Sequence, residues 1–541
     1  MAVTKSALFL LLSTVAADQG LALARGKDGA PLGFVAPPSR STLAFATQAR
    51  AASSTSRIGA NSNVDVLAKP AQGRAGASYM VAADVSGGAS IPVRSGGNKR
   101  PNTQGISYAK NSYDHEKAAR SSGSGVTVGR SIFNLIKNVV GAGILAIPGG
   151  VTAFSQSRAA VVPTVAMIVA LGSMSGYCFS LIGRVCAATG ASSYGDAWAK
   201  TIGKKTSWLP TSSCTAKTFF ACMAYSIIIG TCDVFSDVLT AFGAPGILAA
   251  RTNILCLVSA TVLLPLCLLK DLSALSITSL VGVLGTVYTA TVMGIRYFDN
   301  SYVEGGRFFA GLAQNARPVF SGSGKVNSLA LILLSMLSTA FVAHFNAPKF
   351  YSELKDKSVK RFNTVVGSSF AVAIGLVVIM TLFPFLTFGG ASKSFILNNY
   401  ATSDRLATSC RLAIASSIVG GYPLVFLGAK TGALAAFGIN DPTETQRKVG
   451  TTLLLAMFTA IGVLLTDLGF VVSFGGAVLG SALVFIYPTM MWIAKCKQDA
   501  KNGNPVKGWR KAEIAGNYVV AGLGVSLAVL GGGLSIKKSF F

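Results

Sequence analysis

The chain has 541 residues, of which 51% are hydrophobic and only 12% are charged, and its mean hydropathy is +0.55. This composition excludes an ordinary soluble globular protein and indicates an integral membrane protein. The formal net charge of +27 does not indicate nucleic-acid binding, because no basic run is interleaved with the aromatic residues that line a nucleic-acid groove.

Residues 1–130 are rich in Ser, Ala, Gly and Arg and show neither a helical nor a strand period, so they cannot bury enough apolar surface to fold alone. Residues 1–24 have the lysine, short apolar core and small residues of a possible cleavable signal peptide. Residues 25–130 form a basic leader, expected to be disordered, with transit-peptide composition. This order resembles the bipartite plastid-targeting leaders of algae with plastids of red-algal origin, in which a phenylalanine such as Phe34 lies near the junction. The alternative is a disordered cytosolic tail on a plasma or vacuolar membrane protein.

Beyond the leader, the chain is organised into eleven stretches that contain no Asp, Glu, Lys or Arg. They are residues 138–157, 159–183, 218–232, 252–269, 272–295, 326–348, 362–392, 412–429, 449–466, 468–494 and 514–536. A helix needs roughly 20 apolar residues to cross a bilayer, and backbone groups in lipid must be paired. We therefore predict an all-α integral membrane protein with eleven transmembrane helices. The third stretch is too short unless it continues past Asp233.

The distribution of positive charge predicts the topology. The connections on the side of the N-terminus carry 20 Lys and Arg residues, and the opposite connections and C-terminal tail carry 11. The positive-inside rule therefore places the N-terminus in the cytosol or its plastid equivalent, with an odd number of spans.

The first span contains a predicted break. Glycines at 141, 143, 149 and 150 weaken the helix, and Pro148 removes a backbone donor. In lipid, freed backbone groups are tolerated only where they line a cavity or are buried in protein. Unwound backbone at Gly141–Gly143 would offer N–H groups to a carboxylate. Two alternatives stay open: the glycines allow close helix packing, as at Gly476 and Gly480, or Pro148 simply kinks the helix.

The sixth span contains a second predicted break, within STAFVAHFNAPKFYSEL (338–354). His344 lies in its apolar part, Asn346 and Pro348 interrupt the helix, and Glu353 follows. The two broken spans are five apart, which is the spacing expected when five-helix units repeat with inverted topology.

Several ordered blocks carry a resemblance to a known family. They are SIFNLIKNVVGAGILAIP, TFFACMAYSIIIGTCDVFSDVL, LPLCLLKDLSALSITSLVGVLG, AFVAHFNAPKFYSELKDKS, FILNNYATSDRLATSCRLAIASSIVGGYPLVF and DLGFVVSFGGAVLGSALVFIYP. The chain resembles the amino acid/auxin permease family, which includes neutral and proton-coupled amino acid transporters, over the predicted transporter domain 131–536. The resemblance implies a LeuT-like fold, a five-plus-five inverted repeat in which broken helices 1 and 6 hold the amino acid between them.

The residues expected to contact substrate lie at the two breaks and on the third span. They are Gly141, Ala142, Gly143, Ile144, Phe341, His344 and Tyr225. Tyr225 either lines the substrate cavity or only packs. As one of two histidines, His344 either exchanges protons near physiological pH or is a satisfied polar group at the break.

The residues expected to couple transport to an ion surround the first break. They are Lys137, Asn138, Ser416, Ser417, Asp233 and His344. In the sodium-coupled branch of the family an asparagine usually stands in the register of Lys137, and here the chain looks similar to the proton-coupled members. A fixed ammonium would supply the charge of a sodium ion; the alternative is that Lys137 snorkels to the interface. Ser416 and Ser417 either face this spot or bond their own helix. Asp233 is either a proton carrier or an interfacial residue.

The sequence contains no motif for ATP-driven transport, hydrolysis or a metal centre, so we expect no enzyme activity, cofactor or metal. The expected function is secondary active transport of amino acids by alternating access, coupled to H+ or, as the closest variant, Na+. A non-transporting amino acid sensor of the same fold is the alternative from another class. The expected partners are an amino acid substrate and the lipid bilayer. The nine cysteines are read as small buried hydrophobes.

Overall fold

The computed structural model describes residues 22–25, 31–35, 125–231, 250–269, 276–439, 441–504 and 508–541. The chain divides into two units, Met1–Lys99 and Arg100–Phe541. In the first unit, β1 (Ala22–Arg25) pairs antiparallel with β2 (Pro31–Val35). These two short strands were not expected from the composition of the leader, and the boundaries of the leader stay a prediction.

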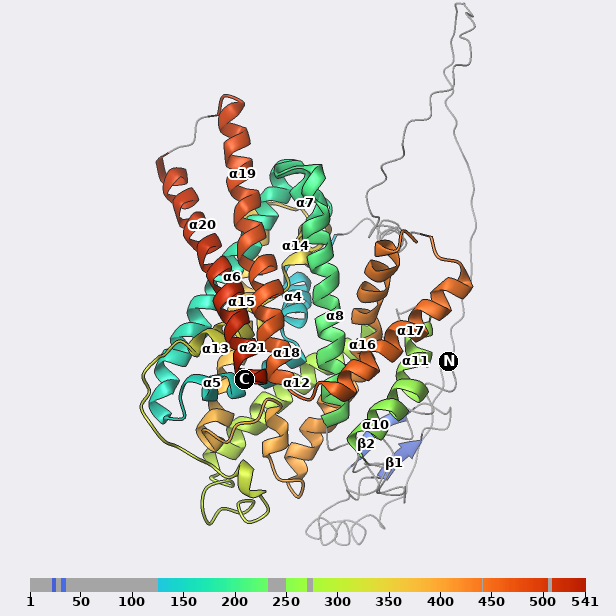
Figure 1. The fold of residues 1–541 in the computed structure, drawn as a ribbon, viewed down its shortest axis with the longest axis vertical. Helices are drawn as coiled ribbons and strands as arrows, with labels where there is room; N and C mark the ends of the chain where they lie inside the picture. Colours follow the sequence, from blue (N-terminus) through green and yellow to red (C-terminus); the bar gives the residue numbers. More distant parts are fainter. Residues whose placement is uncertain are drawn as a thin grey trace, which may run out of the picture. The chain divides into compact units, whose positions relative to one another are not determined.

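The described part of the second unit is helical (Figure 1). Its α-helices are α4 (Val128–Val139), α5 (Ile147–Phe154), α6 (Val161–Thr189), α7 (Tyr194–Thr201), α8 (Trp208–Thr231), α10 (Arg251–Val258), α11 (Leu264–Leu268), α12 (Ser276–Phe298), α13 (Ala330–Ala340), α14 (Ala347–Glu353), α15 (Val359–Phe388), α16 (Arg405–Ala436), α17 (Glu444–Leu464), α18 (Leu468–Gly475), α19 (Tyr487–Lys501), α20 (Gly508–Ser526) and α21 (Gly532–Phe540). Single 3-10 turns and π-helical turns connect several of them, among them η1 (Ala142–Ala146), η7 (His344–Asn346), η8 (Ile396–Asn399), η9 (Gly476–Gly480) and η10 (Ala482–Ile486).

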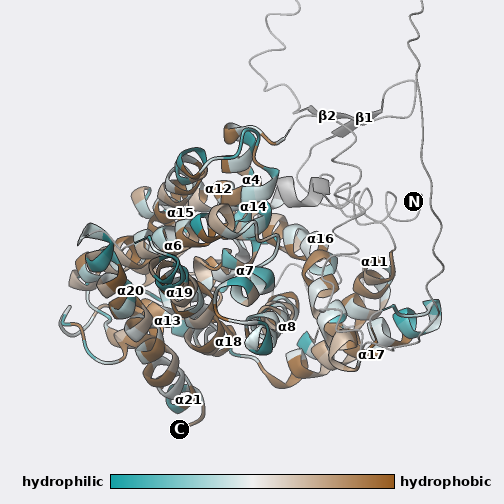
Figure 2. Ribbon diagram, turned by 90° about the horizontal axis from the view of Figure 1, so that it is seen from above, coloured by the Kyte–Doolittle hydropathy of each residue, from teal (hydrophilic) through white to brown (hydrophobic). Residues whose placement is uncertain are grey.

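Among the described residues, nine helices are long and apolar enough to cross a membrane, and the bent pair formed by α4 and α5 makes a possible tenth. The helix α12 overlaps the fifth uncharged stretch but is not one of these nine. The prediction of a multi-pass helical membrane protein is confirmed, whereas the count of eleven spans is not. Figure 2 shows apolar residues along most of the length of these helices.

The third span differs from its prediction. The described part of α8 has 24 residues because the helix begins at Trp208, before the predicted start at residue 218, while Asp233 lies outside the described residues. Lys217 lies inside this helix and is only 9% exposed, because the neighbouring helices cover its side chain. A rule that ends a span at each charged residue therefore misplaces the start of this helix.

The spans α13–α14 and α18–α19 form the centre of the helical unit. In each, 67% of the most apolar stretch is buried, against 22% in α17, which lies at the periphery. Around this centre, α4 packs against α15, α6 against α15 and α19, α12 against α16, and α8 against α16 and α17. Buried apolar side chains fill the space between these helices.

Backbone bridges define two faces of the helical unit. On the first, which we call the N-terminal face, the Val126 N–H donates to the Glu353 carbonyl oxygen at 2.8 Å, just before α4 and at the end of α14. On the second, the opposite face, the segment after α12 reaches across to other connections. There the Val319 N–H donates to the Phe388 carbonyl oxygen at 3.1 Å, and the Gly390 N–H donates to Val319 at 2.7 Å. In Figure 1 the opposite face is at the bottom.

Candidate functional site

The first helix is interrupted after α4. Val140 and Gly141 are extended, with φ of −80° and −125°, before the chain turns into η1 and α5. The first hydrogen bond of the new turn runs from the Ile144 N–H to the Gly141 carbonyl oxygen, at 3.2 Å. The N–H groups of residues 141–143 therefore precede the hydrogen-bond ladder, as at any helix start. Gly141 is exposed, and a Cβ there would meet no atom within 4 Å, so open space adjoins these groups.

The sixth span is interrupted in the same way between α13 and α14. Phe341 and Ala343 have non-helical backbone, and the single turn η7 follows. The Ala343 carbonyl oxygen accepts from the Asn346 N–H at 3.0 Å. No hydrogen bond to the carbonyl oxygens of Phe341 and Val342 is found in the described part of the chain. Phe341 and Ala343 are fully buried, so this unpaired backbone lies inside the protein.

The two interruptions lie beside one another, although about 200 residues separate them in the sequence. The Asn346 side-chain N–H donates to the Asn138 side-chain oxygen at 3.3 Å, which joins the start of α14 to the last turn of α4. A Cβ on Gly143 would lie 3.8 Å from the Cγ2 atom of Thr339, the next-to-last residue of α13. Donors from one break and acceptors from the other are thereby brought to one place.

The side chain of His344 faces α6 and α15. It is fully buried, its Nε2 lies 2.9 Å from the carbonyl oxygen of Ser175, and its ring contacts Phe179 and Phe370 edge-on. This geometry requires a proton on Nε2, because a carbonyl oxygen can only accept. Its Nδ1 has no partner within the described residues. The imidazole thus holds η7 against α6.

The expected coupling residues are distributed over several helices. Lys137 is half-buried in the last turn of α4, and no carboxylate of the described segments lies within ion-pair distance of it. Ser416 is half-buried on α16, and Ser417 packs against Gly282 of α12. The helix α16 packs mainly on α12 and α8, whereas α4 packs mainly on α15. Asp233 lies outside the described residues.

Tyr225 lies on α8 and faces α16. Its ring centroid is 6.3 Å from that of Tyr422, and the neighbouring Ser226 hydroxyl lies 3.0 Å from the Tyr422 hydroxyl. Ile144 is buried, at 1% exposure. The side chain of Ala142 is outside what the structure describes. The structure thus brings together Asn138, Gly143 and the residues of the second break, but shows no direct contact of Tyr225 or the two serines with them.

Three buried charges inside helices were missed by the sequence reasoning. Lys217 of α8 and Lys430 of α16 are 9% and 6% exposed, and Arg411 of α16 is fully buried. The Arg411 Nη2 donates to the carbonyl oxygens of Leu397 and Tyr400, at 2.9 and 2.5 Å. The signal was present in the sequence, since charged residues flanked by long apolar runs are candidates for burial, but each was used only as a span boundary.

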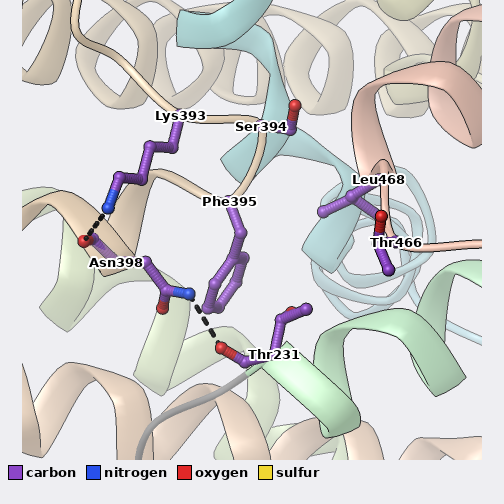
Figure 3. A pocket seen from close by; sticks show the side chains of 7 residues that line it. All are labelled: Thr231, Lys393, Ser394, Phe395, Asn398, Thr466 and Leu468. Carbon is purple, nitrogen blue, oxygen red and sulfur yellow. Dashed lines mark hydrogen bonds between the residues drawn. The ribbon is translucent and has the colours of Figure 1, made fainter. Parts of the chain in front are cut away.

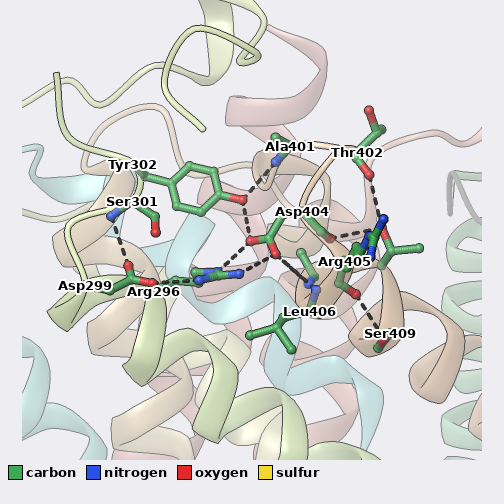
Figure 4. A network of polar contacts seen from close by, with 12 residues as sticks. Arg296, Asp299, Ser301, Tyr302, Ala401, Thr402, Asp404, Arg405, Leu406 and Ser409 are labelled. Atoms are coloured by element: carbon green, nitrogen blue, oxygen red, sulfur yellow. Dashed lines mark hydrogen bonds and ion pairs between the residues drawn. The ribbon is translucent and has the colours of Figure 1, made fainter. Parts of the chain in front are cut away.

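A buried ion-pair network fixes the opposite face (Figure 4). Asp404 is fully buried and caps the start of α16. The Arg296 guanidinium donates two hydrogen bonds to the Asp404 carboxylate, at 2.7 and 2.8 Å. The Tyr302 hydroxyl donates to the same carboxylate at 2.9 Å. Burial and the adjacent Asp404 carboxylate raise the pKa of Tyr302 well above its ordinary value, so its phenol stays a donor.

One cavity in the described segments lies away from the two breaks. It measures about 170 Å³ and lies at the opposite face (Figure 3). Its lining comes from the end of α8, the α15–α16 connection and the α17–α18 connection, and comprises Thr231, Lys393, Ser394, Phe395, Asn398, Thr466 and Leu468. Within the described residues, no group of His, Cys, Asp and Glu is placed to hold a metal ion.

Comparison with known proteins places the chain in a family. Residues 124–535 match the family described as "Transmembrane amino acid transporter protein". The chain is 23% identical over 422 residues to a putative sodium-coupled neutral amino acid transporter 11 of Rattus norvegicus, covering 75% of this chain and 85% of the relative. It is 24% identical over 412 residues to a sodium-coupled neutral amino acid symporter 2 of Danio rerio, covering 73% and 80%.

The chain is also similar to a plant transporter and to a solved transporter structure. The amino acid transporter AVT6E of Arabidopsis thaliana is 24% identical over 397 residues, covering 70% of this chain and 78% of the relative. The inward-facing structure of Mhp1 superposes with a TM-score of 0.48 at 12% identity, covering 77% of this chain and 91% of Mhp1. The family match spans most of the helical unit and identifies a membrane transporter and not an enzyme. The chain belongs to the transmembrane amino acid transporter protein family, as its sequence blocks predicted.

Proposed function

We propose that the protein is a secondary active transporter that moves amino acids across a membrane by alternating access. The observation that carries the proposal is the juxtaposition of two interrupted helices through Asn138, Asn346, Gly143 and Thr339. Unwound backbone at membrane depth is tolerated only where it is buried or lines a cavity, and paired interruptions of this kind are typical of transporter substrate sites.

The backbone of the two breaks supplies complementary chemistry for an amino acid. The N–H groups at Gly141, Ala142 and Gly143 are donors at a helix start and suit a carboxylate. The carbonyl oxygens near Phe341 to His344, among which those of Phe341 and Val342 lack partners, suit an ammonium group. The buried side chains of Ile144 and Phe341 would flank the substrate.

We further propose that the helices form a five-plus-five inverted repeat with eleven spans, so that α4–α5 and α13–α14 are its two equivalent broken helices. Tyr225 on α8 would approach the substrate as the transporter changes state.

The alternative function, a non-transporting amino acid sensor of the same fold, is disfavoured by the matches to proteins named as transporters and symporters.

Coupling to protons is supported by Lys137, whose half-buried ammonium lacks a carboxylate partner in the described segments. This ammonium would occupy the place of a sodium ion beside Asn138, with Ser416 and Ser417 as further polar groups. His344, buried with an unpaired Nδ1, and Asp233 are the proposed proton carriers. Coupling to sodium is the second candidate, because two relatives carry names that state sodium coupling.

The membrane is proposed from the leader alone. Residues 1–24 as a signal peptide and 25–130 as a transit peptide would direct the transporter to a plastid envelope; without them, the plasma or vacuolar membrane is the destination.

Uptake by the full-length protein in proteoliposomes tests the proposal. A mixture of labelled amino acids would be supplied with a proton gradient, a sodium gradient or neither. Uptake that follows the proton gradient supports the first candidate, and uptake that requires sodium supports the second and overturns the role of Lys137. Saturable binding without uptake under any gradient would overturn transport in favour of a sensor.

A further inference from the structure

The lining of the cavity at the opposite face includes Lys393, a cationic side chain without a counter-ion among the described residues. The Lys393 ammonium has a single hydrogen bond, to the carbonyl oxygen of Asn398 at 3.4 Å, and no carboxylate of the described residues lies within ion-pair distance. Asp467, between the lining residues Thr466 and Leu468, instead lines a neighbouring cavity, where it accepts hydrogen bonds from the Ser394 hydroxyl and the Gly469 N–H. A half-buried ammonium with this weak contact is suited to receive a carboxylate.

The same cavity carries an unused acceptor. The Asn398 side-chain N–H donates to the carbonyl oxygen of Thr231 at 2.7 Å, which fixes the amide (Figure 3). The side-chain oxygen of Asn398 is buried and accepts no hydrogen bond within the described segments. A buried acceptor without a donor is unfavourable, so it is suited to receive a donor such as an ammonium group. The hydroxyl groups of Ser394 and Thr466 lie on the same lining.

The remaining wall is apolar and the space is of the right size. Phe395 and Leu468 are buried, and Figure 3 shows the Phe395 ring between Asn398 and Leu468. The volume of about 170 Å³ exceeds that of a cavity of about 150 Å³ that binds benzene. The lining therefore offers a cation, a hydrogen-bond acceptor and an apolar wall to a molecule of this size.

The wall is held in place by residues behind it. The Asn399 side chain accepts from the Lys393 backbone N–H and donates to the Ala391 carbonyl oxygen, both at 2.8 Å. Arg411 fixes the next turn through the carbonyl oxygens of Leu397 and Tyr400. Its Nε and Nη1 have no partner among the described residues, so its buried charge adds to the positive potential behind the turn that carries Asn398.

We propose that this cavity is a second amino acid site, at the opposite face, in which Lys393 binds the carboxylate and Asn398 the ammonium group of an α-amino acid. Phe395 and Leu468 contact its side chain, so small and medium neutral amino acids are preferred. The inference rests on the proposed transport of amino acids and adds a binding position distinct from the one between the two breaks.

Binding stoichiometry of the purified full-length protein tests this second site. The probe is a tritiated mixture of the protein amino acids at saturation, measured by scintillation proximity. The wild type is expected to bind two molecules per chain. Lys393→Gln and Asn398→Leu are each expected to bind one, while Lys325→Gln, which removes an exposed lysine from the α12–α13 segment, still binds two.

A second measurement avoids the risk that a variant fails to fold. In a Cys256→Ser background, the amino acid bound by Ser394→Cys protein is counted before and after position 394 is modified with a bulky thiol reagent, and the modification is expected to lower the count by one. One molecule per chain in the wild type, unchanged by the variants, would overturn the second site and leave the proposed function standing. Two molecules unaffected by every change at the cavity would also overturn it. No binding by the wild type would overturn both proposals.

Discussion

Two regions of this protein are rich in glycine, and the same residue type serves a different purpose in each. At the first break, Gly141 and Gly143 adjoin open space, with no atom or only one within 4 Å of a Cβ placed there. At the contact of η9 with α13, a Cβ on Gly476 would lie 1.8 Å from the carbonyl oxygen of Ser335. Glycine at the break frees the backbone for a ligand, whereas glycine in η9 lets two helices touch. Substitutions at the break should therefore impair amino acid uptake, whereas substitutions in η9 should lower the stability of the fold.

The largest effect is expected at the break. Gly143→Leu places a side chain in the space between η1 and Thr339, where the substrate is proposed to lie, and should lower the rate of amino acid uptake about 100-fold, as a misplacement of about 1 Å does at an active site. The melting temperature should change little. The matched control is Gly367→Leu on α15, which also faces open space. Equal losses of uptake in both variants would contradict the assignment of the site.

The next effect is expected at the packed region. Gly476→Ala forces the Ser335 carbonyl to move and should destabilise the protein by about 1–3 kcal/mol, the usual cost of overpacking. Thermal unfolding in detergent would measure it. Gly516→Ala on α20 has no neighbour within 4 Å and serves as the control, because it should be neutral or slightly stabilising. A Gly476→Ala protein as stable as the control would show that η9 and α13 are not in close contact.

A smaller effect is expected from the hydrogen bond that joins the breaks. Asn346→Ala removes a bond worth about 0.5–1.5 kcal/mol and should raise the KM of uptake about threefold. In the Asn138→Ala background, the same change should add almost nothing, because the partner is already absent. Additive effects of the two substitutions on KM would indicate that these residues act separately.

The smallest effect is expected from Asp299 at the opposite face. Burial alone would raise the pKa of Asp299, but hydrogen bonds from Ser301 and Arg296 outweigh it, and the pKa is lowered from its ordinary value of 3.8. A carboxyl with a lowered pKa stabilises the folded state above the pKa of the unfolded chain and loses this contribution as pH falls through the folded pKa. The melting temperature should therefore fall slightly more below pH 4 in the wild type than in Asp299→Asn. An identical acid dependence in the two proteins would show that ionised Asp299 does not stabilise the folded state.

The sequence predicted the helical membrane architecture well, because apolar stretches free of charge act locally and each overlaps a helix of the structure. It also pointed to the interruptions near Gly141 and Asn346, since glycine and proline weaken a helix wherever they stand. It could not tell the open glycines from the packed Gly476, because that depends on Ser335 of another helix.

The positions of charged residues were the main source of error. Lys217 and Arg411 were read as the ends of spans, but tertiary packing buries both inside helices. The hydrogen bond of His344 to Ser175 likewise depends on a helix far away in the sequence. The cavity at Lys393 and Asn398 is built from the end of α8 and two separate connections, so no local pattern predicts it.

The most direct measurement of the central claim is substrate protection at position 141. A Gly141→Cys substitution would be made in a Cys256→Ser background, since Cys256 is the exposed cysteine among those described, and labelled with a polar maleimide. The extent of labelling would be read by mass spectrometry of the peptide that contains position 141. If an amino acid binds between the two breaks, a transported amino acid slows labelling at this position and a non-transported one does not. Labelling that is unchanged by saturating transported amino acid would contradict the proposed site.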